Sequence, residues 1–173
     1  DVAVGRTFKP EETVLGTAVM LMLVGGAIFG LFAGFFYWWP KIFNRMLNEA
    51  LGKIGFWLMF VGVNMTFGPM HIIGLQGQPR RMYLYPDGYG FNFWNAVSTV
   101  GAFLIAASIA WFIFNIWKSR KEAAHLPPPG PDPWDARSLE WSIQSPAPAH
   151  NFDDDPIVTE LDHWWHQKYG EDE

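Results

Sequence analysis

The chain alternates between three long, uncharged and mostly apolar stretches and shorter polar segments. Residues 13–39, 54–78 and 88–117 contain no Asp, Glu, Lys or Arg, and each stretch is at least 25 residues long. A helix of about 20 residues crosses the roughly 30 Å apolar core of a bilayer. The pattern predicts an all-α integral membrane protein with three transmembrane helices, over about 13–39, 50–76 and 90–118.

The three predicted helices form a membrane domain, residues 13–117. A short N-terminal extramembrane segment, residues 1–12, precedes it, and a tail, residues 118–173, follows it. Prolines crowd the start of the tail at positions 127–133, which predicts an extended, stiff spacer. Trp134, Trp141 and Phe152 are too few to build an independent core. We expect them to hold the tail against neighbouring subunits.

A short helix is predicted at the end of this Pro-rich acidic tail. Asp155 suits its N-cap, Pro156 its first turn and Gly170 its end. Its apolar face would consist of Ile157, Leu161, Trp164, Trp165 and Lys168. His163 and His166 could share a metal with Asp162 or Glu160, but this spacing is common, and we assign no metal site to it.

Charge separates the membrane body from the tail and suggests an orientation. Residues 1–117 carry seven Lys or Arg against five Asp or Glu, and residues 118–173 carry five against twelve. The cations gather after the first and third helices, at Lys41, Arg45, Lys53, Lys118, Arg120 and Lys121. The positive-inside rule then places the tail in the cytoplasm and the loop with Arg80 and Arg81 outside.

The helices differ in the chemistry that they carry. Gly26, Gly30 and Gly34 recur every fourth residue in the first and predict a groove for close helix packing. His71 in the second is interpreted first as a hydrogen-bonded interfacial histidine, with a cofactor contact or a proton path as the alternative. The pair Arg80 and Arg81 could clamp carboxylates or phosphates, or could bind lipid headgroups and fix topology.

Several motifs point to one family. They are Tyr37-Trp38-Trp39-Pro40, Gly52-Lys53-Ile54-Gly55-Phe56, Phe60-Val61-Gly62-Val63-Asn64, Thr66-Phe67-Gly68-Pro69-Met70-His71, Pro79-Arg80-Arg81, Tyr85-Pro86-Asp87, Ser138-Leu139-Glu140-Trp141, His150-Asn151-Phe152 and Pro156-Ile157-Val158. The motifs occur in the order found in one family: the chain resembles the last three helices and the tail of subunit I of the aa3-type haem-copper cytochrome c oxidases. The resemblance extends from about Leu23 to Val158.

The resemblance implies roles for four residues. In the family an arginine pair outside the membrane bonds the propionates of the two haems, which implies the same for Arg80 and Arg81. The second of these helices lines the low-spin haem, which suggests Met59 and Phe67 as haem-wall residues. The family occupies a respiratory plasma membrane in bacteria and archaea, with the orientation that the loop charges predict.

One departure limits what this chain does alone. The family's His-Phe-His iron ligands align with Ala18-Val19-Met20, so both histidines are missing. We therefore expect propionate contacts only, with the haem iron ligated by another chain, no metal ligated by this one and no catalytic residue. The expected partners are the other oxidase subunits, above all a chain with the remaining subunit I helices, and membrane lipid; no nucleic acid is expected.

Three explanations of the departure remain open. The chain is one piece of a split subunit I, a ligand-free paralogue acting as a structural or assembly subunit, or a C-terminal fragment with a replaced leader. The opening Asp1–Pro10 segment does not match the family, which favours the first two, and the arginine pair favours the split subunit. The implied function is a component of a cytochrome c oxidase that reduces oxygen to water and pumps protons. The alternative is a membrane scaffold or assembly factor that has no redox function.

Overall fold

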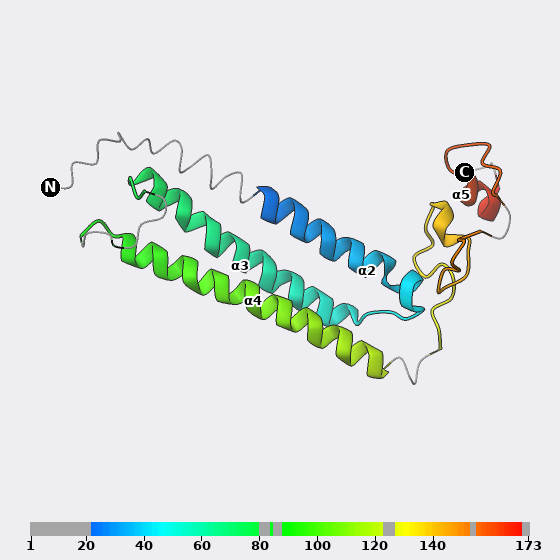
Figure 1. The fold of residues 1–173 in the computed structure, drawn as a ribbon, viewed down its shortest axis with the longest axis horizontal. Coiled ribbons are helices and arrows are strands. Elements are labelled where there is room, and N and C mark those ends of the chain that lie inside the picture. The colour runs from blue at the N-terminus through cyan, green and yellow to red at the C-terminus, as the bar shows by residue number, and fades with distance from the viewer. Residues whose placement is uncertain (1–21, 80–83, 85–87, 123–126, 153–154, 171–173) are drawn as a thin grey trace. The chain divides into compact units, whose positions relative to one another are not determined.

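The computed structural model describes residues 22–79, 84, 88–122, 127–152 and 155–170. Its regular elements are a π-helical stretch η1 (Val24–Ile28), α2 (Phe29–Phe43), α3 (Glu49–Leu75), α4 (Phe91–Glu122), a 3₁₀ turn η2 (Leu139–Trp141) and α5 (His163–Tyr169) (Figure 1). None of the described residues forms a strand. The all-α prediction is confirmed for this part of the chain.

The helices α3 and α4 are the described elements with the length and composition of membrane spans. At 27 and 32 residues, they would extend about 40 and 48 Å at 1.5 Å per residue, more than the roughly 30 Å apolar core of a bilayer. Their bounds lie within four residues of the predicted helices over 50–76 and 90–118. The first predicted span is described only from residue 22, as η1 and α2.

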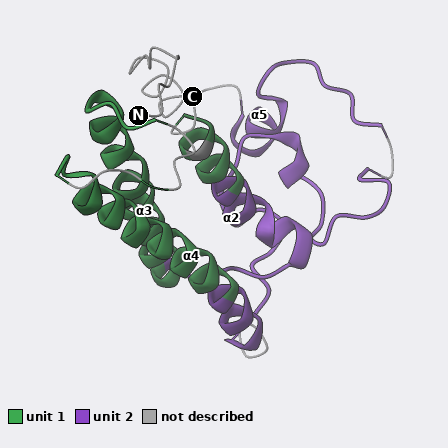
Figure 2. Cartoon of the chain, turned by 60° about the vertical axis from the view of Figure 1, so that its left-hand side comes forward, with its two compact units in different colours: residues 1–31, 50–113 green, residues 32–49, 114–173 purple. Residues whose placement is uncertain are grey.

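Two compact units divide the chain (Figure 2). Unit 1 comprises residues 1–31 and 50–113, and unit 2 comprises residues 32–49 and 114–173. Most of α3 and α4 therefore belongs to unit 1. Unit 2 combines most of α2, the end of α4 and the tail.

In unit 1, α3 and α4 are antiparallel and approach closely at glycines. A β-carbon placed on Gly101 of α4 would lie 2.5 Å from the backbone nitrogen of Thr66, and one on Gly62 of α3 would lie 2.9 Å from that of Ile105. Such contacts leave no room for a side chain, so these glycines set the separation of the helices. Gly26 and Gly30 of the first helix have nothing within 4 Å, so the groove predicted there for another helix stays a prediction.

Buried hydroxyl groups along the same helix pair bond to the opposite backbone. Ser98 of α4 donates to the carbonyl of Thr66 at 3.0 Å, and Ser108 donates to the carbonyl of Gly55 at 2.8 Å. Both serines are at most 6% exposed. Each bond satisfies a buried polar group that would otherwise destabilise the pair.

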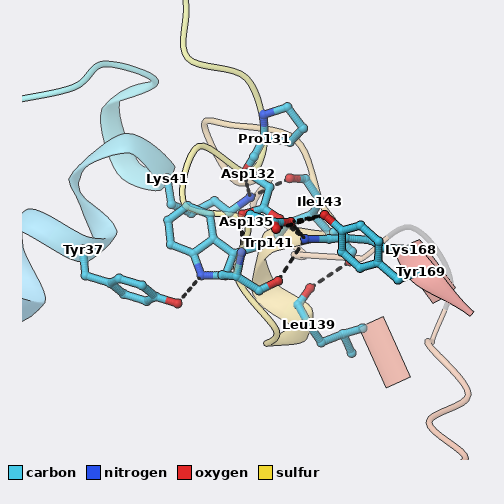
Figure 3. Close-up of polar contacts among 12 residues, drawn as sticks. Tyr37, Lys41, Pro131, Asp132, Asp135, Leu139, Trp141, Ile143, Lys168 and Tyr169 are labelled. Carbon is cyan, nitrogen blue, oxygen red and sulfur yellow. Dashed lines mark hydrogen bonds and ion pairs between the residues drawn. The ribbon is translucent and has the colours of Figure 1, made fainter. Parts of the chain in front are cut away.

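Unit 2 is organised around the contact between the end of α2 and the tail (Figure 3). Trp141 is fully buried, and its indole nitrogen donates to the hydroxyl oxygen of Tyr37 at 2.9 Å. Lys41 lies with its ammonium 5.3 Å from the centre of the Trp141 ring. It donates to the carbonyls of Pro131, at 3.2 Å, and Ile143.

This contact changes the expectation for the tail aromatics. Trp134 donates to the carbonyl of Tyr37 at 2.9 Å, so it binds the same turn of α2 that Trp141 covers. Both tryptophans therefore bind the tail to α2 of the same chain, and the expected contact with neighbouring subunits stays a prediction. Burial lowers the pKa of Lys41, an effect that nearby Asp132 and Glu140 partly offset.

The terminal helix differs from its prediction at one end. It begins at His163 with Asp162 as N-cap, instead of at Asp155, and ends at Gly170 as predicted. Ile157 and Leu161 precede the helix and are exposed, so they are not part of its face. A short helix has little stability of its own, and it forms here where side chains anchor it.

Lys168 and Tyr169 are those anchors (Figure 3). The Lys168 ammonium bonds the carboxylates of Asp132 and Asp135 and the carbonyl of Ala136. The Tyr169 hydroxyl donates to Asp135 at 2.9 Å. The upstream residues 155–160 are exposed and non-helical.

Candidate functional site

The segment leading to the predicted arginine clamp begins where α3 ends. Gly77 has φ +93°, a left-handed conformation that glycine adopts without strain. Its N–H donates to the carbonyl of Gly74 at 3.1 Å, and the N–H of Gln78 donates to that of Ile73 at 2.9 Å. These two bonds form a Schellman cap, which terminates the helix and turns the chain away from its axis.

A side-chain bond then fixes the start of the loop. Asn95 of α4 donates to the side-chain oxygen of Gln78 at 3.2 Å. Both residues belong to unit 1. The bond holds the chain to α4 two residues before Arg80. Arg80 and Arg81 themselves lie outside the described residues.

The two predicted haem-wall residues occupy different environments on α3. Met59 is 2% exposed and Val63, one turn further along, is 3% exposed. Their side chains are thus enclosed by this chain itself. Phe67 is half-buried and retains surface that another group can contact.

Phe67 shares a face of α3 with three residues that the sequence did not single out as a set. Phe60, Asn64 and His71 follow the 3.6-residue period with Phe67, and all are exposed or half-buried. Asn64 donates to the carbonyl of Phe60 at 2.8 Å, one helical turn back. The spacing of residues 60, 64, 67 and 71 could have predicted that they share one face of the helix. We call these four residues the outer face of α3.

His71 is oriented by the helix backbone. Its Nδ1 lies 2.8 Å from the carbonyl oxygen of Phe67. Since a carbonyl only accepts, Nδ1 carries the proton, and in the neutral imidazole Nε2 is left as an acceptor. The interfacial, hydrogen-bonded interpretation therefore fits, and Nε2 is available to a donor on another element.

The tail histidines contact neighbouring polar side chains. His166 Nδ1 lies 2.8 Å from a carboxylate oxygen of Glu160, and His163 Nδ1 lies 3.3 Å from the hydroxyl of Thr159. Within the described part of the chain, no cluster of three or more His, Cys, Asp or Glu residues could hold a metal ion.

Several known proteins similar to this chain are subunit 1 of a cytochrome c oxidase or a quinol oxidase. Residues 19–104 match the family described as cytochrome C and quinol oxidase polypeptide I. Cytochrome c oxidase subunit 1 of Bacillus sp. (strain PS3) is 47% identical over 148 residues, which are 85% of this chain and 24% of that protein. Its counterpart in Bacillus subtilis (strain 168) is 44% identical over 149 residues, 85% of this chain and 23% of that protein.

A quinol-oxidising relative is also similar. Cytochrome bo(3) ubiquinol oxidase subunit 1 of Buchnera aphidicola is 37% identical over 168 residues, 94% of this chain and 25% of that protein. The chain thus spans about a quarter of the length of the curated relatives that it matches.

Proposed function

Because this chain belongs to the cytochrome c and quinol oxidase polypeptide I family, we propose that it supplies subunit I helices to a haem-copper oxidase of the aerobic respiratory chain. The complex would reduce oxygen to water and pump protons. The observation that carries this proposal is the similarity to cytochrome c oxidase subunit 1 over 85% of the chain. It favours an oxidase component over a ligand-free scaffold.

We propose that Arg80 and Arg81 bind haem propionates. Guanidinium groups pair with carboxylates through two parallel hydrogen bonds, which gives both orientation and charge neutralisation. The cap at Gly77 and the bond between Gln78 and Asn95 support this role, because they fix the chain just before the arginines.

Phe67 is the proposed apolar contact of the same cofactor. Its half-buried ring lies on the outer face of α3, where a flat aromatic side chain can pack against a macrocycle. The burial of Met59 within the chain supports helix packing as its main role. Bound haem would provide the redox chemistry, and these residues would orient it and balance its charge.

Another polypeptide is the proposed source of the haem iron ligands. Ala18, Val19 and Met20 stand where the family's two histidines align, and none of the three offers an imidazole. We propose that a chain with the remaining subunit I helices is the partner. In this arrangement α3 and α4 cross the membrane, with the loop of Arg80 and Arg81 on the outer side and the tail in the cytoplasm.

The test is a double substitution in the assembled oxidase. Arg80→Ala with Arg81→Ala should shift the haem absorption bands and lower the haem midpoint potential, because nearby positive charge stabilises the reduced state. Arg120→Ala with Lys121→Ala removes two adjacent cations at the opposite end of α4 and serves as the control. Unchanged spectra and potential in a fully assembled Arg80 and Arg81 variant would contradict the proposal, and unchanged spectra with reduced assembly would support a scaffold.

A further inference from the structure

A cavity of about 540 Å³ lies in unit 2, where the connection from α2 to α3 meets the end of α4 and the proline-rich segment. Residues 43–48, Ser119, Glu122 and residues 127–129 line it. Its volume falls within the range of about 300–1,000 Å³ typical of small-molecule sites.

A buried hydrogen-bond network holds the wall of this cavity in place. The N–H of Asn48 donates to the hydroxyl of Ser119 at 2.9 Å, and the Asn115 side chain donates to the carbonyl of Asn48 at 3.1 Å. Ser119 in turn donates to Asn115 at 3.0 Å. Asn115 is 1% exposed and Ser119 is 4% exposed. The connection is therefore bound to α4, which fixes this wall of the cavity.

Two opposite charges line the cavity without pairing with each other. Arg45 donates to the carbonyl of Arg120 at 3.4 Å and, among the residues that the structure describes, has no carboxylate partner. Glu122 forms an ion pair with Lys118 and accepts a hydrogen bond from the Asn48 amide, both at 3.5 Å, and its side chain is 44% exposed. The cavity thus offers a guanidinium for an anion and a partly exposed carboxylate for a cation.

Apolar side chains adjoin these charges. Phe43 and Met46 line the cavity and are 42% and 37% exposed. The exposed Trp38 lies further back on the same helix, α2, in the aromatic stretch typical of a membrane interface. A ligand with both a charged head and an apolar body fits this combination.

We propose that the cavity binds the phosphoethanolamine headgroup of a membrane phospholipid, with the phosphate at Arg45 and the ammonium at Glu122. Guanidinium binds phosphate through paired hydrogen bonds, and a primary ammonium donates to carboxylate oxygens. A choline headgroup has no N–H to donate, and a glycerol headgroup has no cation for Glu122. This inference goes beyond the proposed function and requires only that the chain lies in a membrane.

The experiment measures lipid binding to the delipidated oxidase complex by native mass spectrometry. Phosphatidylethanolamine, phosphatidylcholine and phosphatidylglycerol with the same acyl chains are added in separate titrations. We expect one phosphatidylethanolamine to bind most tightly, and Arg45→Gln to weaken it about tenfold or more. Arg137→Gln is the matched control, because Arg137 pairs with Asp162 in the tail and does not line the cavity.

A second variant and a soluble headgroup make the test independent of one substitution. Glu122→Gln should remove the preference for phosphatidylethanolamine over phosphatidylcholine while leaving haem spectra unchanged. Unaltered binding in Arg45→Gln, or an unaltered preference in Glu122→Gln, would overturn the proposal. Free O-phosphoethanolamine that binds as tightly as the lipid would overturn the assignment to a membrane lipid.

Discussion

Gly101 on α4 lies so close to Thr66 on α3 that the two backbones leave no space for a side chain between them. The β-carbon of Gly101→Ala would lie 2.5 Å from the Thr66 nitrogen and 2.6 Å from its hydroxyl oxygen. We expect a loss of about 1–3 kcal/mol of stability, because the helices must separate. Thermal unfolding of the purified complex measures it.

Gly68→Ala is the matched control for that substitution, since Gly68 lies on the partner helix α3 and has nothing within 4 Å of a β-carbon placed on it. It should leave the unfolding temperature unchanged or slightly raised. Equal stability of the two variants would contradict the close-packing role of Gly101.

Trp141→Ala should release the tail from α2. The side chain is fully buried and bonded to Tyr37, so its removal leaves a cavity and an unpaired hydroxyl, with an expected cost of about 3–5 kcal/mol. Limited proteolysis of the tail in membranes should become much faster. Trp134→Phe removes a bond at the same turn of α2 from an exposed ring and should have a small effect. Similar proteolysis of both variants would count against Trp141 as the main attachment.

The attachment of α5 should weaken in acid. The hydrogen bond from Lys168, followed by that from Tyr169, lowers the pKa of Asp135 below its usual 3.8. A lowered carboxyl pKa stabilises the folded state above pH 3.8, and this contribution disappears as the pH falls through the lower folded value. Hydrogen exchange in residues 163–170, corrected for intrinsic rates, should therefore rise below pH 3.8.

Asp135→Asn provides the comparison for this pH dependence. It removes the titrating group while Asp132 still bonds Lys168. We expect exchange in α5 to be faster than in the wild type at neutral pH and to depend less on acid. An identical acid response in both proteins would show that another group is responsible.

Phe67 and Met59 should respond differently to truncation. Phe67→Ala removes a half-buried ring from the outer face of α3 and should shift the haem spectrum with little loss of stability. Met59→Ala empties a position that is 2% exposed and should cost about 2–5 kcal/mol with a smaller spectral effect. Absorption spectra and unfolding of the assembled complex separate the two effects. The reverse pattern would assign the cofactor contact to Met59.

The long helices were predictable because their length and lack of charge are local properties of the sequence. α3 and α4 therefore appear within a few residues of the predicted ranges. The start of α5 was not predictable in this way. Asp155 and Pro156 favour helix initiation, but the side chains that anchor the segment, Lys168 and Tyr169, lie only at its end. The position of an anchor 33 residues away along the chain is not visible in a local pattern.

One boundary of the candidate site also followed from the sequence. The predicted helix over 50–76 ends one residue beyond the last residue of α3, and the structure places the cap directly after it, at Gly77. The burial of Met59 could not be predicted, because it depends on which face of α3 meets α4. That face is determined by the approach of Gly62 and Gly101, which lie on different helices.

The ammonium of Lys41 also determines how much length variation the tail can accept. It bonds the carbonyls of Pro131 and Ile143 at once, so the residues between them form a loop that closes on a single nitrogen atom. An inserted residue inside that loop would displace one of the two carbonyls, whereas an insertion in the preceding prolines would leave both in place. The first half of the tail thus has two zones, one of fixed length beside α2 and one that is free to lengthen.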